Sequence, residues 1–102
     1  MKVILITAVA AYLEDLKKIL RNSKIETYTF QEVIGYRDTT LDAISSNWFA
    51  SEHNERASIL CHVFAESAKA FELAKNIEHF NQEQEVQSKI HYNILANEQF
   101  NH

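Results

Sequence analysis

The sequence predicts one α+β domain with the element order βαββαβ, in which two helices cover one face of a four-stranded antiparallel sheet. Three observations predict it. Residues 2–9 form an apolar, β-branched run of strand length. Three later segments of similar length divide their residues between two faces, and two further segments repeat apolar residues at helical spacing. With 102 residues, 46% apolar and 24% charged, the chain has enough apolar residues for one core and is too apolar to be disordered.

The first half of the chain supplies a strand, a helix and a second strand. The strand at 2–9 is followed by a predicted helix at 12–22, whose acidic residues come early and whose basic residues come late, as the helix dipole favours. The apolar stripe of this helix consists of Tyr12, Leu13, Leu16, Ile19 and Leu20. Residues 25–34 are predicted to form the second strand, and Gly35, the only glycine of the chain, is predicted to close it.

The second half repeats the pattern in the order strand, helix, strand. The third strand is predicted from Ala57 to Phe64, and Ser67 is the expected N-cap of the second helix. Its apolar stripe consists of Ala70, Leu73, Ala74, Ile77 and Phe80. The last strand is predicted from Ile90 to Leu95. This order of elements is that of the ferredoxin-like plait.

One face of the predicted sheet has no helix to cover it. If the side chains of Ile59, Cys61 and Val63 point toward the helices, then those of Leu60, His62, Phe64 and Leu95 point away. Such a face is too apolar to remain in water and too polar for the core of a monomer. Association between copies is therefore expected, and a closed ring of three with the sheets inward is one symmetric solution. The alternative is a monomer with scattered exposed apolar residues.

Residues 36–55 form an unusually long connection between the second and third strands. Connections longer than about 12–15 residues are uncommon in compact domains and are often functional. This one carries four apolar side chains that are costly to expose: Leu41, Ile44, Trp48 and Phe49. We expect them to pack against the domain or a neighbouring subunit, or else to await a partner. The connection is the leading candidate for an interaction element.

The chain resembles the PII-type signal-transduction proteins. The resemblance rests on the first strand, MKVILITAV, on residues 32–36, which are similar to the family's E-V-x-G-[FY] stretch, and on the long connection that follows. It implies a homotrimeric plait that senses a small molecule and acts through residues 36–55 on a protein partner such as a transporter or an enzyme. The CutA copper-tolerance family is similar in architecture and weaker in sequence.

The resemblance also guides where a ligand is expected. It points to a cleft between subunits near Gly35, Tyr36 and Arg37. The planar guanidinium of Arg37 suits a carboxylate or phosphate. The alternative, which is more common for such an arginine, is an ion pair on the surface. The classical ATP site is not expected, because residues 80–89 contain no glycine and two carboxylates, and only Lys89 offers positive charge there. Lys89 is therefore a candidate ligand-binding residue together with Gly35, Tyr36 and Arg37. The ligand therefore stays unidentified.

Metal binding is the sharper alternative, and it would make the chain a CutA-like protein of metal homeostasis. The candidate ligands are His53, His62, His91 and His102, gathered from several subunits. Histidines hydrogen-bonded in a polar interface are the more ordinary expectation, because a zinc site needs three or four converging ligands. A third alternative is a purely structural oligomerisation module.

Several classes of protein are disfavoured. The net charge of −4 argues against a nucleic-acid binder. The chain has no run of 18 consecutive apolar residues, the length that a membrane-spanning helix needs. No catalytic motif occurs, so an enzyme is not expected. A single cysteine, Cys61, excludes an internal disulfide and favours the cytoplasm.

Overall fold

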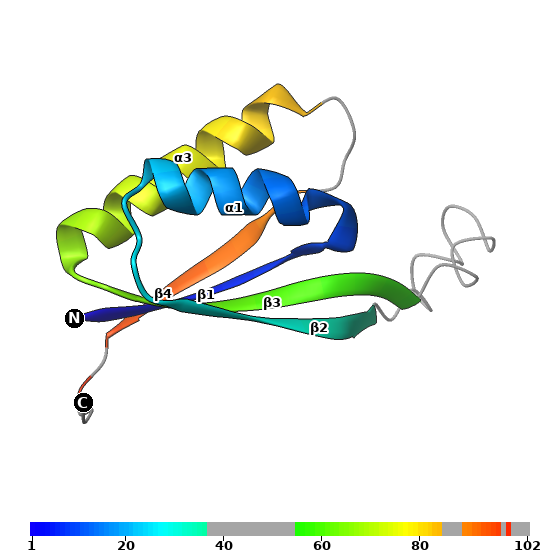
Figure 1. Ribbon diagram of the computed structural model, residues 1–102, viewed down its shortest axis with the longest axis horizontal. Coiled ribbons are helices and arrows are strands. Elements are labelled where there is room, and N and C mark those ends of the chain that lie inside the picture. The colour runs from blue at the N-terminus through cyan, green and yellow to red at the C-terminus, as the bar shows by residue number, and fades with distance from the viewer. Residues whose placement is uncertain (37–54, 85–88, 97, 99–102) are drawn as a thin grey trace, which may run out of the picture.

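The computed structural model describes residues 1–36, 55–84, 89–96 and 98. Four strands form one antiparallel sheet in the order β2-β3-β1-β4, and both helices lie on the same face of it (Figure 1). The strands are β1 (Lys2–Val9), β2 (Tyr28–Tyr36), β3 (Glu55–Ala65) and β4 (His91–Ala96). The helices are α1 (Leu13–Asn22), which a short 3-10 turn η1 (Ala10–Tyr12) precedes, and α3 (Ser67–Glu83). The predicted ferredoxin-like plait is confirmed.

The core lies between the sheet and the two helices. Alternate residues of β1 and β3 face the helices and are buried there, while the apolar stripes of α1 and α3 close over them. The central side chains of this core are Ile4, Ile6, Leu16, Leu20, Cys61, Val63, Leu73 and Ile77. Each buried aliphatic side chain of this size contributes about 1.5–3 kcal/mol. The predicted inward direction of Ile59, Cys61 and Val63 is therefore confirmed.

The turn after α1 explains why β2 starts later than predicted. The Ile25 amide donates to the Leu20 carbonyl and the Lys24 amide to the Arg21 carbonyl, each at 3.0 Å, with Lys24 at φ 59°. These two bonds form a Schellman motif. Residues 25–27 follow this turn. The Thr27 carbonyl accepts a hydrogen bond from the Phe64 amide of β3 at 3.3 Å, but the regular pairing of β2 with β3 begins at Tyr28 rather than at residue 25.

The other end of β2 also differs from the prediction. Gly35 does not close the strand but lies within it, because β3 begins at Glu55 and offers partners for two more residues: Gly35 pairs with Arg56 and Tyr36 with Glu55. β2 and β3 therefore extend beyond the end of β1, whose last pair is Val9 with Ser58.

Both helices differ from the prediction at their starts, and they share one polar contact. α1 begins at Leu13 rather than at residue 12, which belongs to η1. Ser67 is the first residue of α3 rather than its N-cap; Glu66 occupies the cap position and makes no side-chain cap hydrogen bond. Asn76 of α3 donates to the hydroxyl of buried Ser23 at 2.8 Å, and that hydroxyl donates to the Ile19 carbonyl at 2.7 Å. This chain of bonds links α3 to the end of α1.

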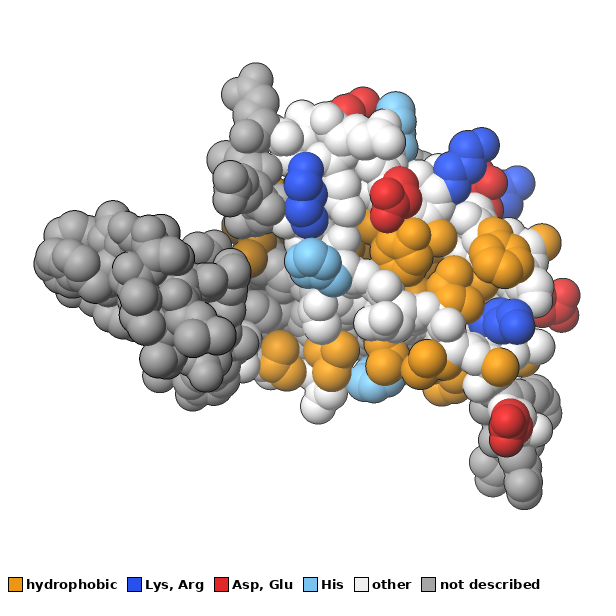
Figure 2. All heavy atoms as spheres, turned by 180° about the vertical axis from the view of Figure 1, so that it is seen from behind, with side chains coloured by type: hydrophobic (Ala, Val, Ile, Leu, Met, Phe, Trp, Pro, Cys, Tyr) orange, Lys and Arg blue, Asp and Glu red, His pale blue; other side chains and the backbone are white. Residues whose placement is uncertain are grey.

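The face of the sheet opposite the helices carries no permanent charge on the side chains that the structure describes. The strand register places these side chains on it: Val3, Leu5, Thr7, Val9, Thr29, Gln31, Val33, Ser58, Leu60, His62, Phe64, His91, Asn93 and Leu95. We call them the open face. Phe64 is 43% exposed and Leu95 47%, which confirms their predicted direction. Figure 2 shows hydrophobic side chains in a row along this lower side of the molecule.

One row of paired residues crosses the whole sheet. Gln31 pairs with Leu60, Leu60 with Thr7, and Thr7 with His91. This row fixes the relative height of residues on the two outer strands, β2 and β4, and it is used below to compare them.

Candidate functional site

A cleft of about 560 Å³ lies where the end of α3 meets the start of β4. It is open to solvent, and its walls mix apolar and polar groups. The residues that line it are Glu78, Asn81, Gln82, Lys89, Ile90, His91 and Tyr92. We call it the α3–β4 cleft. Of these residues the sequence predicted only Lys89 as a ligand-binding residue and His91 as a candidate metal ligand.

Asn81 holds the floor of this cleft together. Its side-chain nitrogen donates to the Ile90 carbonyl at 2.9 Å, and its side-chain oxygen accepts from the Ile90 amide at 2.8 Å. The Lys89 ammonium donates to the Asn81 carbonyl at 2.9 Å. The amide and carbonyl of Ile90 are therefore both bonded to Asn81, while its side chain is buried in the core. This explains why β4 starts at His91 and not, as predicted, at Ile90.

Tyr92 and Glu78, which also line the cleft, interact with each other. Burial of the phenol, its hydrogen bond to Glu78 and the negative charge of that carboxylate raise the pKa of Tyr92. The phenol therefore stays neutral and acts as the donor in the bond to Glu78. The residues that line the cleft thus include both an ammonium, that of Lys89, and a carboxylate, that of Glu78.

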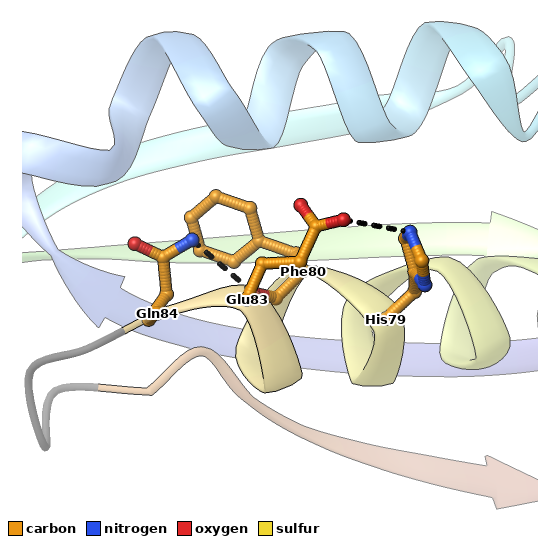
Figure 3. Close-up of polar contacts among 4 residues, drawn as sticks. All are labelled: His79, Phe80, Glu83 and Gln84. Carbon is orange, nitrogen blue, oxygen red and sulfur yellow. Dashed lines mark hydrogen bonds and ion pairs between the residues drawn. The ribbon is translucent and has the colours of Figure 1, made fainter.

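The last turn of α3 is fixed by contacts around the cleft (Figure 3). His79 and Glu83 approach to 3.0 Å on the solvent side, and the Gln84 side chain donates to the Phe80 carbonyl at 3.1 Å. The Phe80 ring turns toward α1 and meets Tyr12 of η1, directly before that helix, edge to face with ring centroids 5.1 Å apart. The exposed His79–Glu83 pair adds little stability, whereas the aromatic contact fixes how α3 lies on the domain.

A second cleft, of about 380 Å³, lies where β2 and β3 run past β1. Its lining residues are Ala10, Glu32, Val33, Ile34, Ala57 and Ser58. Ile34 is 59% exposed although its side chain is on the helix side of the sheet, because the helices do not extend over this end. The β2–β3 end therefore presents an apolar side chain beside the carboxylate of Glu32.

The predicted ligand residues are not brought together within one chain. Gly35 lies within β2 and Lys89 lies two residues before β4, so they are at the same end of the sheet but at its opposite outer strands. Three strand spacings separate these strands, a distance of about 14 Å. The side chain of Tyr36 and all of Arg37 lie outside the described part of the structure, as do Leu41, Ile44, Trp48 and Phe49 of the long connection.

The predicted metal ligands are also separated. His62 pairs with Leu5 and His91 with Thr7, so the two histidines share the open face but differ by two residues in height and by two strands in position. This puts their backbones about 12 Å apart. Among the residues that the structure describes, no three His, Cys, Asp or Glu side chains form a group that could hold a metal ion. His53 and His102 lie outside those residues.

The sequence reasoning missed Glu78, Asn81, Gln82 and Tyr92 as cleft residues. The bonds between Asn81 and Ile90 join residues nine apart, and the contact between Glu78 and Tyr92 joins a helix to a strand. Neither follows a local periodicity. The sequence offered one signal: the apolar stripe of the second helix ends at Phe80, ten residues before the predicted strand at Ile90, so the end of the helix and the start of the strand could not lie far apart.

No protein-family model and no curated protein sequence matches the chain. Among the described residues, no helix is long and apolar enough to cross a membrane. Solved structures, by contrast, match over almost the whole chain.

The similar structures are PII-like proteins. CPII, a nitrogen regulatory PII-like protein from Thiomonas intermedia K12, superposes with a TM-score of 0.59 in its complex with ADP, AMP and bicarbonate, at 14% identity over 94% of this chain and 92% of that chain. Its complex with ADP, AMP and acetate gives 0.61 at 12% identity, over 94% and 88%. TTHA0516 from Thermus thermophilus, proposed to be a PII-like signaling protein, gives 0.59 at 14% identity, over 91% and 82%. The chain therefore has the fold of PII-like proteins.

Proposed function

We propose that this chain, which has the PII-like fold, is a divergent PII-like regulator. It is a non-catalytic homotrimer that binds a small molecule between its subunits and acts on a protein partner, such as a transporter or an enzyme, through residues 36–55. The observation that carries the proposal is the open face, a sheet surface whose described side chains carry no permanent charge in a chain of which 24% is charged.

The open face supports assembly. The buried centre of an interface between proteins is typically depleted of charged residues. Phe64 and Leu95 are exposed on this face while the opposite face is covered by helices. Facing the three open faces inward would remove these side chains from water and leave the helices outside. This is the closed ring of three that the uncovered sheet face suggested as one symmetric solution.

Assembly also accounts for the position of the ligand residues. The end of β2 with Gly35 and the cleft with Lys89 lie at opposite edges of one chain, so in a ring the two edges of neighbouring copies meet. The ligand site would then be shared between subunits. The ammonium of Lys89 and the open α3–β4 cleft suit a small anion.

The class of ligand follows from this chemistry. CPII, which has a similar fold, is bound to ADP, AMP and bicarbonate in one structure and to ADP, AMP and acetate in another. In this chain residues 80–89 lack glycine and carry Glu83 and Glu85, so a phosphate cradle of backbone amides is not expected. A small carboxylate or bicarbonate therefore fits better than a nucleotide. With its single buried cysteine, we place the protein in the cytoplasm.

Light scattering and thermal shift test the proposal. We expect a mass of three chains of 11.8 kDa in solution. Bicarbonate, acetate, 2-oxoglutarate, AMP, ADP, ATP, Cu(II) and Zn(II) are then added one at a time, since a ligand at 100 times its Kd stabilises by about 2.7 kcal/mol. We expect an anion to raise the Tm, and Lys89→Gln to reduce this shift, while Lys69→Gln on the exposed side of α3 leaves it unchanged.

The other outcomes discriminate between the alternatives. Stabilisation by a free metal ion but not by its chelate would favour a CutA-like metal protein. A trimer that responds to none of the compounds would favour a structural module. A monomer at all micromolar concentrations would refute the proposal.

A further inference from the structure

We propose that Glu78 makes the α3–β4 cleft select bicarbonate and small monocarboxylates over dicarboxylates. This inference rests on the proposed function, which places a small anion beside Lys89, and it names the class of anion that the cleft prefers. Glu78 is thus a specificity-determining residue, and Tyr92 is the positioning residue that holds its carboxylate.

The lining of the cleft carries one permanent charge of each sign. The positive charge is the ammonium of Lys89 and the negative charge is the carboxylate of Glu78. The other lining residues are Asn81, Gln82, Ile90, His91 and Tyr92. With the histidine uncharged, the two charges cancel before a ligand enters. A monocarboxylate then leaves one negative charge in excess, and a dicarboxylate leaves two.

The Lys89 ammonium can still donate to a ligand. It donates one proton to the Asn81 carbonyl at 2.9 Å, and an ammonium has three. The side chain of Asn81 is itself bonded to both the amide and the carbonyl of Ile90. Lys89 is therefore the charged donor that an anion meets in this cleft, and its other two protons suffice for one carboxylate or one bicarbonate.

Tyr92 holds the Glu78 carboxylate in the cleft. Tyr92 pairs with Ile6, whose side chain is buried beneath the helices, so the phenol also projects to the helix side of the sheet and reaches Glu78 of α3. The neutral phenol donates to that carboxylate. Among the described residues, Glu78 and Lys89 line the same cleft but form no ion pair with each other.

The held carboxylate acts on the second charge of a ligand. The first carboxylate of a dicarboxylate can accept from the Lys89 ammonium, but the second cannot share that position. Within a cleft of about 560 Å³ the second carboxylate is repelled by Glu78, and no second permanent cation among the described lining residues offsets this repulsion. Because the cleft is open to solvent, the repulsion is reduced, and we expect a preference of about tenfold.

Isothermal titration calorimetry with a matched pair of ligands tests the selection. Malonate carries two carboxylates, and malonamate has the same shape with one of them replaced by a neutral amide. At pH 8 and constant ionic strength, we expect the wild-type protein to bind malonamate and acetate about tenfold more tightly than malonate. Malonate that binds as tightly as malonamate, or more tightly, would overturn the proposal.

Glu78→Gln removes the charge and keeps an acceptor for the Tyr92 phenol. We expect this variant to lose the preference, chiefly because malonate binds more tightly. Glu72→Gln is the matched control, since it removes the same charge from an exposed residue of α3 that does not line the cleft, and it should keep the wild-type preference. A preference that persists in Glu78→Gln would show that another group sets it.

Tyr92→Phe tests the positioning role. Without the phenol, the Glu78 carboxylate can turn and pair with the Lys89 ammonium, so we expect malonamate, acetate and malonate all to bind more weakly by a similar factor. Combining Tyr92→Phe with Glu78→Gln removes the competing carboxylate and should restore the affinity for malonamate. Circular dichroism verifies that each variant is folded. Unchanged affinities in Tyr92→Phe would refute the positioning role.

The two proposals fail in different ways. A wild-type protein that binds none of these anions, bicarbonate included, refutes the anion site of the proposed function together with this inference. A wild-type protein that binds all of them, with affinities that Glu78→Gln leaves unchanged, refutes only the role of Glu78.

Discussion

The side chain of Asn81 and the backbone of Ile90 hold each other through two hydrogen bonds that run in opposite directions, at 2.9 and 2.8 Å. One amide side chain thereby occupies both polar backbone groups of a residue whose own side chain is buried. The end of α3 and the start of β4 are joined at this point, and the α3–β4 cleft lies directly beside it.

Asn81→Ala removes both bonds and leaves the amide and carbonyl of Ile90 without this partner. We expect the free energy of unfolding, measured in urea, to fall by about 1–3 kcal/mol. Gln82→Ala, an exposed neighbour in the same cleft, is the control and changes stability by less than about 0.5 kcal/mol. Equal values for the two variants would show that the bonds to Ile90 contribute nothing.

Lys24→Gly is expected to stabilise the protein. Lys24 has φ 59° at the position that follows α1, where glycine has no steric penalty. Relief of this strain outweighs the added freedom of the unfolded chain, and we expect a gain of about 0.5–1 kcal/mol, seen as a Tm higher by a few degrees. Lys18→Gly, inside α1, should instead cost about 1 kcal/mol. A Tm that falls for Lys24→Gly would contradict this account.

Stability is expected to fall at alkaline pH because of Cys61. Burial raises the pKa of this thiol from 9.0 to about 12. Below pH 9 the thiol is protonated in both states and the contribution is complete; above pH 9 only the unfolded state ionises. Stability then falls by up to about 1.4 kcal/mol per pH unit until the folded thiol also ionises. Urea unfolding from about pH 7 to 11 should show a shallower decline for Cys61→Ala; parallel curves would exclude the thiol as a cause.

Phe64→Glu is expected to break the proposed trimer. It places a carboxylate on a face whose described side chains carry no permanent charge, so three carboxylates would be buried together. Sedimentation at micromolar concentration should report a folded monomer. Phe64→Leu keeps the face apolar and should remain trimeric. A trimer formed by Phe64→Glu would mean that the open face is not the interface.

The sequence predicted the sheet and its two faces because these depend on periodicity. β1 begins and ends as expected, and alternation placed Cys61 inside and Phe64 outside. The ends of the strands, by contrast, depend on individual contacts that leave no periodic pattern in the sequence. The Lys24 turn delayed β2, and the partners offered by β3 carried β2 through Gly35.

The candidate site was harder to predict for a related reason. Lys89 was identified from its charge, but its neighbours Asn81 and Tyr92 are assembled from a helix and a strand and leave no local pattern. Gly35 and Lys89 were both predicted to bind the ligand, and the strand order shows that one chain keeps them at opposite edges of the sheet. Strand order is decided by the packing of the whole domain.

The unequal lengths of the strands have a dynamic consequence. Ile34, Gly35 and Tyr36 pair only with β3, as a two-stranded ribbon beyond the last pair of β1, whereas Ile59 to Val63 are held from both sides. The ribbon can therefore fray without disturbing the hydrophobic interior. In deuterated water its amide protons should exchange well before those at the middle of β3, because this end of the sheet opens locally while the centre stays paired.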